Sequence, residues 1–531
     1  MVDQEPAQMG ASTLRELIGT ALACGAADVG GPLSARELAL AKRATPTSYS
    51  VTRKVRAAIC EGDDPLGQAF CALRSPVERR QMGAFFTNAT IVTPMVEWCL
   101  AQGPIRLVDP GCGSGRFSVA AARRNTGLQI FAVDLDPVAC LLTRAALAAV
   151  KAKRVRVLQC DYLSASIPLI AGRTAYVGNP PYVRHHDLDA ATKLRASVLA
   201  EKIGYRISGL AGLHALFYLA TLAKHGASGD VGSFVTSAEW LDVGYGSIVR
   251  WIFTNGLGGR SLLVFDPESV PFDDAMTTAA ITTFQIGGAP QKARIARISS
   301  ARAASALETV GRDVDRATLA EAHRWSPLLS QDTQQSSDDT IGTLFRVSRG
   351  QVTGANSFFV MTRTEARQRG IERFCVPLVS SADEIFSAAG TLRDGPERKV
   401  GLSIPKETNL AKYPALAAYL RAGEAAKVQN GYIASRRRPW YSITFPCPPI
   451  VATYMARQPP FFALNPDGLG LLNVAHGLHP RRRLSSRTLD RVVELLNAAR
   501  ASFVGRGRTY HGGLEKFEPR EMEAIPLKVA S

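Results

Sequence analysis

The sequence predicts an α/β protein built on a doubly wound sheet of parallel strands, followed by a second domain of mixed α+β structure. Short β-like runs alternate with helical segments between residues 76 and 290, which is typical of strand–helix–strand units. The composition shifts at residues 291–340, and the residues beyond are rich in Gly, Pro and Arg with short strand-like pieces. A chain of 531 residues also favours two domains.

The expected strands are short runs rich in β-branched and apolar residues. Ala/Leu-rich helical segments such as Val119–Arg124 and Val138–Val150 lie between most of them. Because parallel strands need crossover connections of this kind, the alternation favours a doubly wound sheet. We expect strands at Ile105–Val108, Gln129–Val133, Arg154–Leu158, Ala175–Gly178, Ser233–Thr236, Leu262–Phe265 and Thr277–Phe284.

The chain divides into four expected segments. Residues 1–75 form a helical extension, residues 76–290 the α/β domain, residues 291–340 a linker ending in QDTQQSSDDT, and residues 341–531 the second domain. The extension carries no chemistry that the sequence reveals. Its apolar residues recur at helical spacing: Leu14, Leu17, Ile18, Ala21 and Leu22. A further helix is expected at Thr488–Arg500.

Composition excludes several classes of protein. Hydrophobic residues make up 46%, enough for buried cores, and no run of eighteen apolar residues or leader segment predicts a membrane span or secretion. Nine cysteines lie between Cys24 and Cys447 without a CxxC pair, so we expect no zinc site, no disulfide framework and a reduced, cytoplasmic location. The formal charge of +17 favours a polyanionic partner but also fits a basic soluble protein.

A glycine-rich turn follows the first expected strand, in the segment IRLVDPGCGSGRFSVAAARR at residues 105–124. The strand ends at Asp109, and the turn contains Gly111, Gly113 and Gly115. Glycines let the backbone approach a ligand closely at the carboxyl end of a strand. The turn lacks the Lys and Ser/Thr of a triphosphate-binding loop, so it predicts either a nucleoside-type cofactor site or a plain tight turn.

Two acids at the ends of the next strands favour the cofactor interpretation. Asp134 follows the glycines by about twenty residues, where an acid accepts hydrogen bonds from ribose hydroxyls. Asp161, within LQCDYL and followed by Tyr162, is placed to meet the adenine end of a nucleoside. Each Asp alone also fits a helix cap or turn. Three successive strand ends with an acid favour a ligand with free ribose hydroxyls.

The segment AYVGNPPYVRHH at residues 175–186 predicts the reaction. Two prolines stiffen the backbone, so the Asn179 side chain and the Pro180 carbonyl are aimed at one place. Together they can accept the two N–H bonds of an exocyclic amine, which frees its lone pair to attack a methyl group. Tyr182, after Pro181, supplies a flat surface for a base flipped out of a duplex. No metal is required.

These motifs resemble those of the gamma-class adenine-N6 DNA methyltransferases of type II restriction–modification systems. The resemblance implies a Rossmann-like class I methyltransferase domain, S-adenosylmethionine as cofactor, and Asn179 at both the catalytic and the cofactor site. QMGAFFTNATIVTPMV is similar to the family's methionine-binding motif, with Thr87-Asn88 in place of the common Thr-Pro, and it implies Phe86 and Thr87 as cofactor contacts. VPFDDAMTTAAITTF implies Phe272 as a second aromatic against the flipped base.

The second domain resembles the family's target-recognition domain, which implies double-stranded DNA as partner. FRVSRGQVTGANSFFVMT at residues 345–362 places Gly350, Gly354 and Asn356 in the matching positions. Clustered arginines suit phosphate and guanine contacts. In SRRRPWYSI these candidates are Arg436, Arg437 and Arg438, with Trp440 beside them. Because no nuclease signature is evident, the family implies a separately encoded restriction endonuclease.

Three alternatives stay open. Methyltransferases that modify a protein glutamine amide use the same NPPY chemistry, although they usually lack a large basic domain after the catalytic one. N4-cytosine methyltransferases more often have Ser at the position of Asn179. A DNA-binding protein that keeps the fold without turnover is the third. His185 and His186 are expected to be solvated loop residues rather than general bases.

Overall fold

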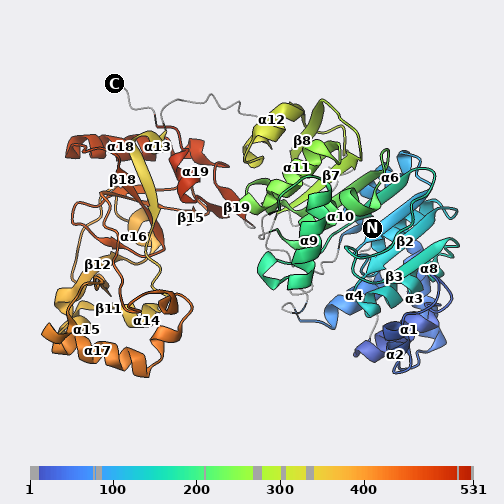
Figure 1. Ribbon diagram of the computed structural model, residues 1–531, viewed down its shortest axis with the longest axis horizontal. Coiled ribbons are helices and arrows are strands. Elements are labelled where there is room, and N and C mark those ends of the chain that lie inside the picture. Colours follow the sequence, from blue (N-terminus) through green and yellow to red (C-terminus); the bar gives the residue numbers. More distant parts are fainter. Residues whose placement is uncertain are drawn as a thin grey trace, which may run out of the picture. The chain divides into compact units, whose positions relative to one another are not determined.

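The computed structural model describes residues 11–75, 78, 87–207, 211–266, 278–299, 307–329, 340–510 and 514–527. The chain forms two compact units, Met1–Gln331 and Asp332–Ser531 (Figure 1). Within the described ranges no helix is both long and apolar enough to cross a membrane.

The first unit is built on one sheet, to which the described residues contribute nine strands in the order β3-β2-β1-β4-β5-β7-β6-β8-β9 (Figure 1). Strands β1 to β5 are parallel to one another, as predicted, whereas β7 pairs antiparallel with both β5 and β6. The bounds are β1 Arg106–Pro110, β2 Gln129–Asp134, β3 Val155–Gln159, β4 Thr174–Gly178, β5 Val231–Ser237, β6 Gly259–Phe265, β7 Ala279–Gln285, β8 Lys292–Ile298 and β9 Arg312–Asp315.

Alternating side chains of the central strands bury opposite faces of this sheet. In β1, Leu107 belongs to one apolar core and Val108 to the other; in β2, Ile130 and Phe131 divide in the same way. Apolar residues on both faces require helices on both sides, which is the doubly wound arrangement. One core includes α6 Ala89–Ala101, α7 Arg116–Arg124 and α8 Pro137–Ala149, and the other α9 Ala190–Lys202, α10 Leu213–Ala220, α11 Ser247–Asn255 and α12 Arg316–Glu321.

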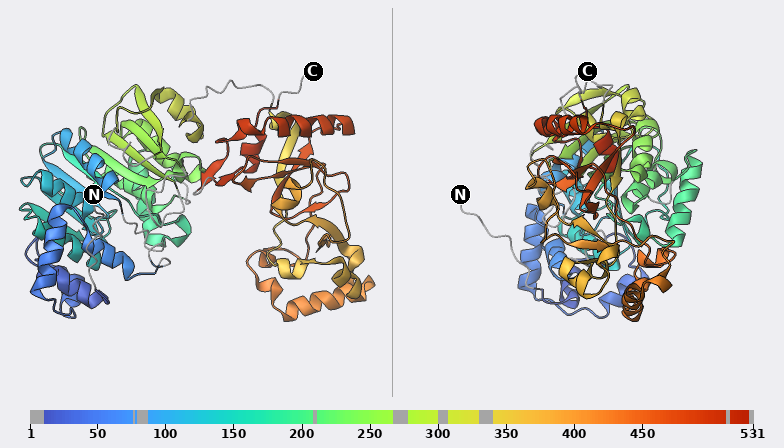
Figure 2. Two further views of the ribbon diagram at one scale, coloured as in Figure 1. Left: turned by 180° about the vertical axis from the view of Figure 1, so that it is seen from behind. Right: turned by 90° about the vertical axis from the view of Figure 1, so that its left-hand side faces the viewer.

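Residues 11–75, called the N-terminal block below, pack into the first of these cores rather than forming a separate body. Leu17 and Ile18 of α1 are buried there, and the predicted helical spacing is confirmed. The blue helices lie beside α8 at one end of the unit in Figure 1 and in the left view of Figure 2. The block contains α1 Leu14–Ala23, α2 Ala35–Ala41, α3 Tyr49–Glu61 and α4 Pro65–Ala72.

The structure differs from the linker expected at residues 291–340. Lys292–Ile298 forms β8, which pairs parallel with β6, and Arg312–Asp315 forms β9 antiparallel to β8. Ala293 and Ile295 are buried while Lys292 is exposed. This alternation is typical of a strand with one covered face. The small and basic residues of the segment, however, have the composition expected of a loop.

The second unit contains three small sheets among its described residues: β10-β18-β14-β16, β11-β13-β12-β17 and β15-β20-β19. In Figure 1, α14, α15 and α17 gather with β11 and β12, whereas α13, α18 and α19 lie by β18. The strands are β10 Phe345–Arg349, β11 Val360–Met361, β12 Cys375–Val379, β13 Val400–Leu402, β14 Ile450–Thr453, β15 Met455–Ala456, β16 Phe462–Leu464, β17 Gly470–Leu471, β18 Ala475–Pro480, β19 Arg508–Tyr510 and β20 Leu514–Lys516. The helices are α13 Ile341–Leu344, α14 Asn356–Phe359, α15 Arg363–Gln368, α16 Ala382–Phe386, α17 Pro414–Ala425, α18 Ser486–Ala498 and α19 Pro519–Glu523.

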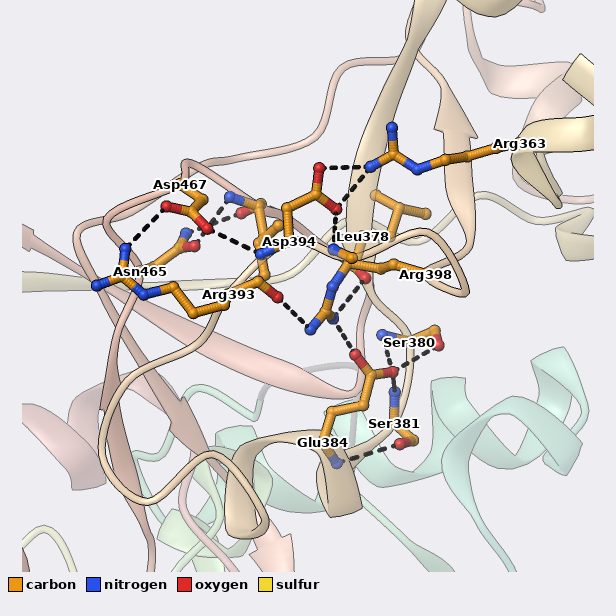
Figure 3. Close-up of polar contacts among 12 residues, drawn as sticks. Arg363, Leu378, Ser380, Ser381, Glu384, Arg393, Asp394, Arg398, Asn465 and Asp467 are labelled. Carbon is orange, nitrogen blue, oxygen red and sulfur yellow. Dashed lines mark hydrogen bonds and ion pairs between the residues drawn. The ribbon is translucent and has the colours of Figure 1, made fainter. Parts of the chain in front are cut away.

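A network of ion pairs fixes the segment at residues 393–398 in this unit (Figure 3). The backbone N–H of Asp394 donates to Asp467 at 2.8 Å, and the Asp394 carboxylate accepts from Arg363 at 2.6 Å. Arg398 pairs with Glu384 of α16. Several charges that share partners hold a loop more firmly than isolated surface pairs do. The network therefore ties this loop to α15, to α16 and to the turn after β16.

Candidate active site

The predicted cofactor residues meet at the carboxyl ends of β1, β2 and β4. Asp109 lies near the end of β1, Asp134 ends β2, and Asn179 directly follows β4. The turn after β1 places Gly111, Gly113 and Gly115 at φ values of 71°, 55° and 88°. L-residues with side chains rarely adopt this left-handed region, which explains the three glycines.

Hydrogen bonds hold this turn, called the cofactor loop below, against β2. The N–H of Gly111 donates to Val133 O at 2.8 Å, and the N–H of Gly113 donates to Asp134 Oδ2 at 2.9 Å. A Cβ added to Gly113 would meet no atom of the described chain within 4 Å. The loop is thus fixed against β2, and the described residues leave space at Gly113, as a ligand site at a strand end requires.

Both acids at the ends of β1 and β2 have raised pKa values. Burial raises the pKa of Asp109 to about 7 and that of Asp134 to about 6, because the protein removes water from the charged form. Ser118 opposes the shift of Asp109 by donating from its N–H and its hydroxyl to Oδ2, at 3.0 and 2.7 Å. Among the described residues, Asp109 Oδ1 accepts no hydrogen bond. The end of β1 therefore holds acceptor capacity that its described contacts do not use.

Asn179 presents one free acceptor at the same edge. Its Nδ2 donates to Thr87 Oγ1 at 3.1 Å, which orients the amide. Its Oδ1 is buried and has no donor within the described part of the chain. A buried carbonyl oxygen without a partner is uncommon because it loses its bonds to water. Within the described residues, this oxygen therefore keeps an unused acceptor.

The NPPY segment and α10 lie close to the cofactor loop at Gly111. A Cβ added there would lie 3.5 Å from Pro181 Cδ and 3.6 Å from Cε1 of Phe217 on α10. Phe217 was not predicted as a site residue, because in LHALFYLA it has the pattern of a core helix. Its ring lies 5.0 Å from that of Tyr162. Tyr162 itself is buried, and its hydroxyl shares a hydrogen bond of 2.9 Å with Thr221.

Asp161 and Tyr182 have protein partners as well. Asp161 pairs with Arg195 of α9 at 3.1 Å and accepts from the N–H of Leu163 at 3.0 Å. The Tyr182 ring packs edge-on against His214, with 6.2 Å between centroids. Burial lowers the pKa of His214 to about 4, so it is a neutral imidazole near pH 7. Phe86 and Phe272 lie outside the described residues, whereas His186 is exposed as expected.

In the second unit, the predicted glycines allow close backbone contacts. A Cβ on Gly350 would lie 2.0 Å from Leu472 O, and one on Gly354, at φ 77°, would lie 2.6 Å from Ile433 Cβ. Asn356 begins α14 and accepts from the hydroxyl of Thr353. These contacts shape the segment between β10 and α14, and its role toward DNA stays a prediction.

The three predicted arginines of this unit differ in their contacts. Arg437 donates to the carbonyls of Val352 and Thr353 at 2.6 and 2.7 Å, and Arg438 caps Ser435 O at 2.7 Å. Trp440 donates to Glu424 at 3.1 Å. Arg436 is exposed, and its guanidinium lies 3.8 Å above the ring of Tyr432, itself 69% exposed.

A cavity of about 400 Å³ lies behind the cofactor loop. It is bordered by Asp63 and Asp64 of the N-terminal block, Thr93 of α6, and Ser114 and Arg116 of the loop and α7. Within the described residues, no group of three or more His, Cys, Asp or Glu side chains is arranged to hold a metal ion.

The fold and the site define a Rossmann-like class I methyltransferase domain followed by a second α+β unit. A solved relative supports this fold: the type IIL restriction-modification enzyme MmeI in complex with DNA superposes with a TM-score of 0.54 at 13% identity. The match covers 79% of this chain and 65% of that chain, so this protein spans less than two thirds of that enzyme.

Sequence comparison identifies the family. Residues 322–531 match the C-terminal domain of the type II methyltransferase M.Eco57I. The type II methyltransferase M.XamI of Xanthomonas campestris pv. amaranthicola is 39% identical over 473 residues, 87% of this chain and 86% of that protein. M.AccI of Acinetobacter calcoaceticus is 24% identical over 469 residues, 84% and 85% of the two chains. The chain belongs to the type II methyltransferases of restriction–modification systems, in the gamma order of motifs, and the predicted family is confirmed.

Proposed function

We propose that this chain transfers the methyl group of S-adenosylmethionine to N6 of an adenine within a short, specific DNA sequence. The observation that carries the proposal is Oδ1 of Asn179, which is buried without a partner among the described residues and follows β4, the strand paired with β1. An exocyclic amine supplies the N–H donor that this oxygen lacks.

The strand-end residues fit the cofactor. The space that the described residues leave at Gly113 gives room for a ligand against the backbone, and Asp134 at the end of β2 is our candidate acceptor for ribose hydroxyls. Asp109 and Thr87 complete the edge on which a nucleoside with an amino-acid tail would lie. S-adenosylmethionine supplies a methyl group on a sulfonium sulfur, which leaves as a neutral thioether when a nitrogen takes the methyl.

The chain's own residues activate the nitrogen. The lone pair of the adenine amine is delocalised into the ring, which makes the amine a poor nucleophile. Asn179 Oδ1 and the Pro180 carbonyl accept its two N–H bonds and favour tetrahedral geometry at nitrogen, so the lone pair becomes available. The proton that is then lost passes to solvent. Tyr182 covers one face of the flipped base.

The partners follow from the family and the charge. An excess of basic side chains suits a DNA substrate, and the exposed Arg436 and Arg438 are its candidate contacts. Methylation would protect the DNA of a bacterial cytoplasm from a separately encoded endonuclease. Cleavage of unmethylated DNA by the purified chain would contradict this division of labour.

Nucleoside mass spectrometry tests the reaction directly. Unmethylated plasmid is incubated with the purified chain and S-adenosylmethionine, and we expect N6-methyladenine. N4-methylcytosine would keep the mechanism and overturn the choice of base. Cofactor binding without any modified base would instead favour a protein glutamine or RNA substrate.

Replacement of Asp134 tests the cofactor site. We expect Asp134→Ala to weaken S-adenosylmethionine binding by about tenfold or more, because a charged acceptor is lost. In the native chain the ionised form must accept the hydroxyls, so affinity should be constant above pH 7 and fall as pH drops below about 6. Calorimetry measures both effects, and an unchanged affinity in the variant would refute the ribose contact.

A further inference from the structure

The N-terminal block reaches the cofactor loop through one side chain. Asp64 caps α4, because its Oδ1 accepts the N–H of Gly67 at 2.8 Å. Its Oδ2 accepts the hydroxyl of Ser114 at 2.5 Å. Ser114 stands between Gly113 and Gly115, so a residue fifty positions earlier in the chain holds the centre of the loop.

This contact is closely packed. Asp64 is 7% exposed, and a Cβ added to Gly67 would lie 2.2 Å from Asp64 Oδ2 and 2.6 Å from Ser114 Oγ. No side chain fits at that position without separating the two partners. Burial raises the pKa of Asp64. The positive charge of Arg116 and the hydrogen bonds that Asp64 accepts from Ser114 and Gly67 act in the opposite direction. The carboxyl group is therefore enclosed, and each of its oxygens accepts a hydrogen bond: one from Gly67 of α4 and the other from Ser114 of the loop.

The loop is consequently held from two sides. The N–H of Gly113 donates to Asp134 of β2, and the next side chain, Ser114, donates to Asp64 of the block. Thr143 of α8 adds a third bond, from its hydroxyl to Gly113 O at 2.8 Å. A loop with three glycines has large conformational freedom, and each anchor lowers the entropy that a ligand must remove on binding.

We propose that Asp64 is a positioning residue of the cofactor site, and that through Ser114 the N-terminal block keeps the loop in its binding conformation. The inference rests on the proposed use of S-adenosylmethionine, and it gives residues 11–75 a function. Without the bond, the loop populates conformations that do not bind, and the apparent affinity falls by the lost fraction.

The test uses the full chain and the variant Ser114→Ala, which leaves the cap of α4 intact. We expect the Kd for S-adenosylmethionine to rise about tenfold, the order of one lost hydrogen bond. Asp64→Ala should raise it similarly, and the double variant should be no weaker than Asp64→Ala alone. The KM for DNA should stay unchanged.

A readout without cofactor keeps the inference separate from the proposed function. Amide hydrogen exchange at Gly113 and Gly115 should become faster in Ser114→Ala. The matched control is Thr13→Ala, which removes the cap of α1 in the same block, where Thr13 accepts from Glu16 N–H at 3.3 Å. It should lower the melting temperature without changing loop exchange or Kd.

Different results separate the two hypotheses. One result is a native chain that binds no S-adenosylmethionine but whose Ser114→Ala variant shows faster loop exchange. It would overturn the proposed function and support the role of the Asp64–Ser114 hydrogen bond in holding the loop. A native chain that binds, with Kd and loop exchange unchanged in Ser114→Ala, would overturn the inference and leave Asp64 as a helix cap only.

Discussion

Replacing Asn179 with alanine is expected to lower kcat for methyl transfer by about a thousandfold or more, while the Kd for S-adenosylmethionine stays within a few-fold of native. The reason is that the nitrogen and the oxygen of this amide have different surroundings. Its Nδ2 is engaged by Thr87, whereas its Oδ1 is buried without a donor in the described chain. The truncation removes the acceptor for the amine and little that the cofactor needs. Single-turnover kinetics and calorimetry measure the two quantities.

His186→Ala is the control from the same segment. His186 is 57% exposed and lies 3.6 Å from Asp187, so its loss should change neither rate nor binding. If Asn179→Ala loses cofactor binding as much as activity, or melts well below the control, Asn179 supports the structure of the site rather than the transition state.

The cofactor edge could be predicted because each part is local in the sequence. An apolar run followed by Asp109 or Asp134 marks a strand and its end, and parallel strands bring such ends to one edge. The NPPY segment adds Asn179 after a third strand. The same logic failed for β8, where the basic Lys292 and Arg294 alternate with apolar residues and give a loop-like composition.

The sequence does not reveal which side chains far apart in the chain form hydrogen bonds with each other. Asp64 and Ser114 are fifty residues apart, and neither stands in a pattern that reveals the other. Residue type also defines what a side chain can do without fixing its partner. Tyr162 was expected at the cofactor, and its hydroxyl binds Thr221; Arg437 was expected on DNA, and its guanidinium holds two backbone carbonyls.

Glu37→Ala is expected to produce the largest loss of stability among single substitutions in the N-terminal block. Glu37 pairs with Arg144 of α8 at 2.8 Å, and their side chains are 0% and 1% exposed. Arg144 also donates to the carbonyls of Val29 and Gly31 at 2.7 Å. Removing the carboxylate leaves a buried guanidinium without its counter-charge, which costs about 3–5 kcal/mol.

The melting temperature of the first unit, residues 1–331, should therefore fall by about 4–7 °C, measured by calorimetry without cofactor. Glu97→Ala is the matched control, because Glu97 pairs with Arg124 in the same unit while 55% exposed, and such a pair contributes less than about 1 kcal/mol. Equal shifts in the two variants would show that water reaches Arg144. A large shift for Glu37→Ala alone would establish that the Glu37–Arg144 pair bonds the N-terminal block to α8. Because Thr143 of the same helix holds the cofactor loop, the block and the loop would then form one cooperative structure.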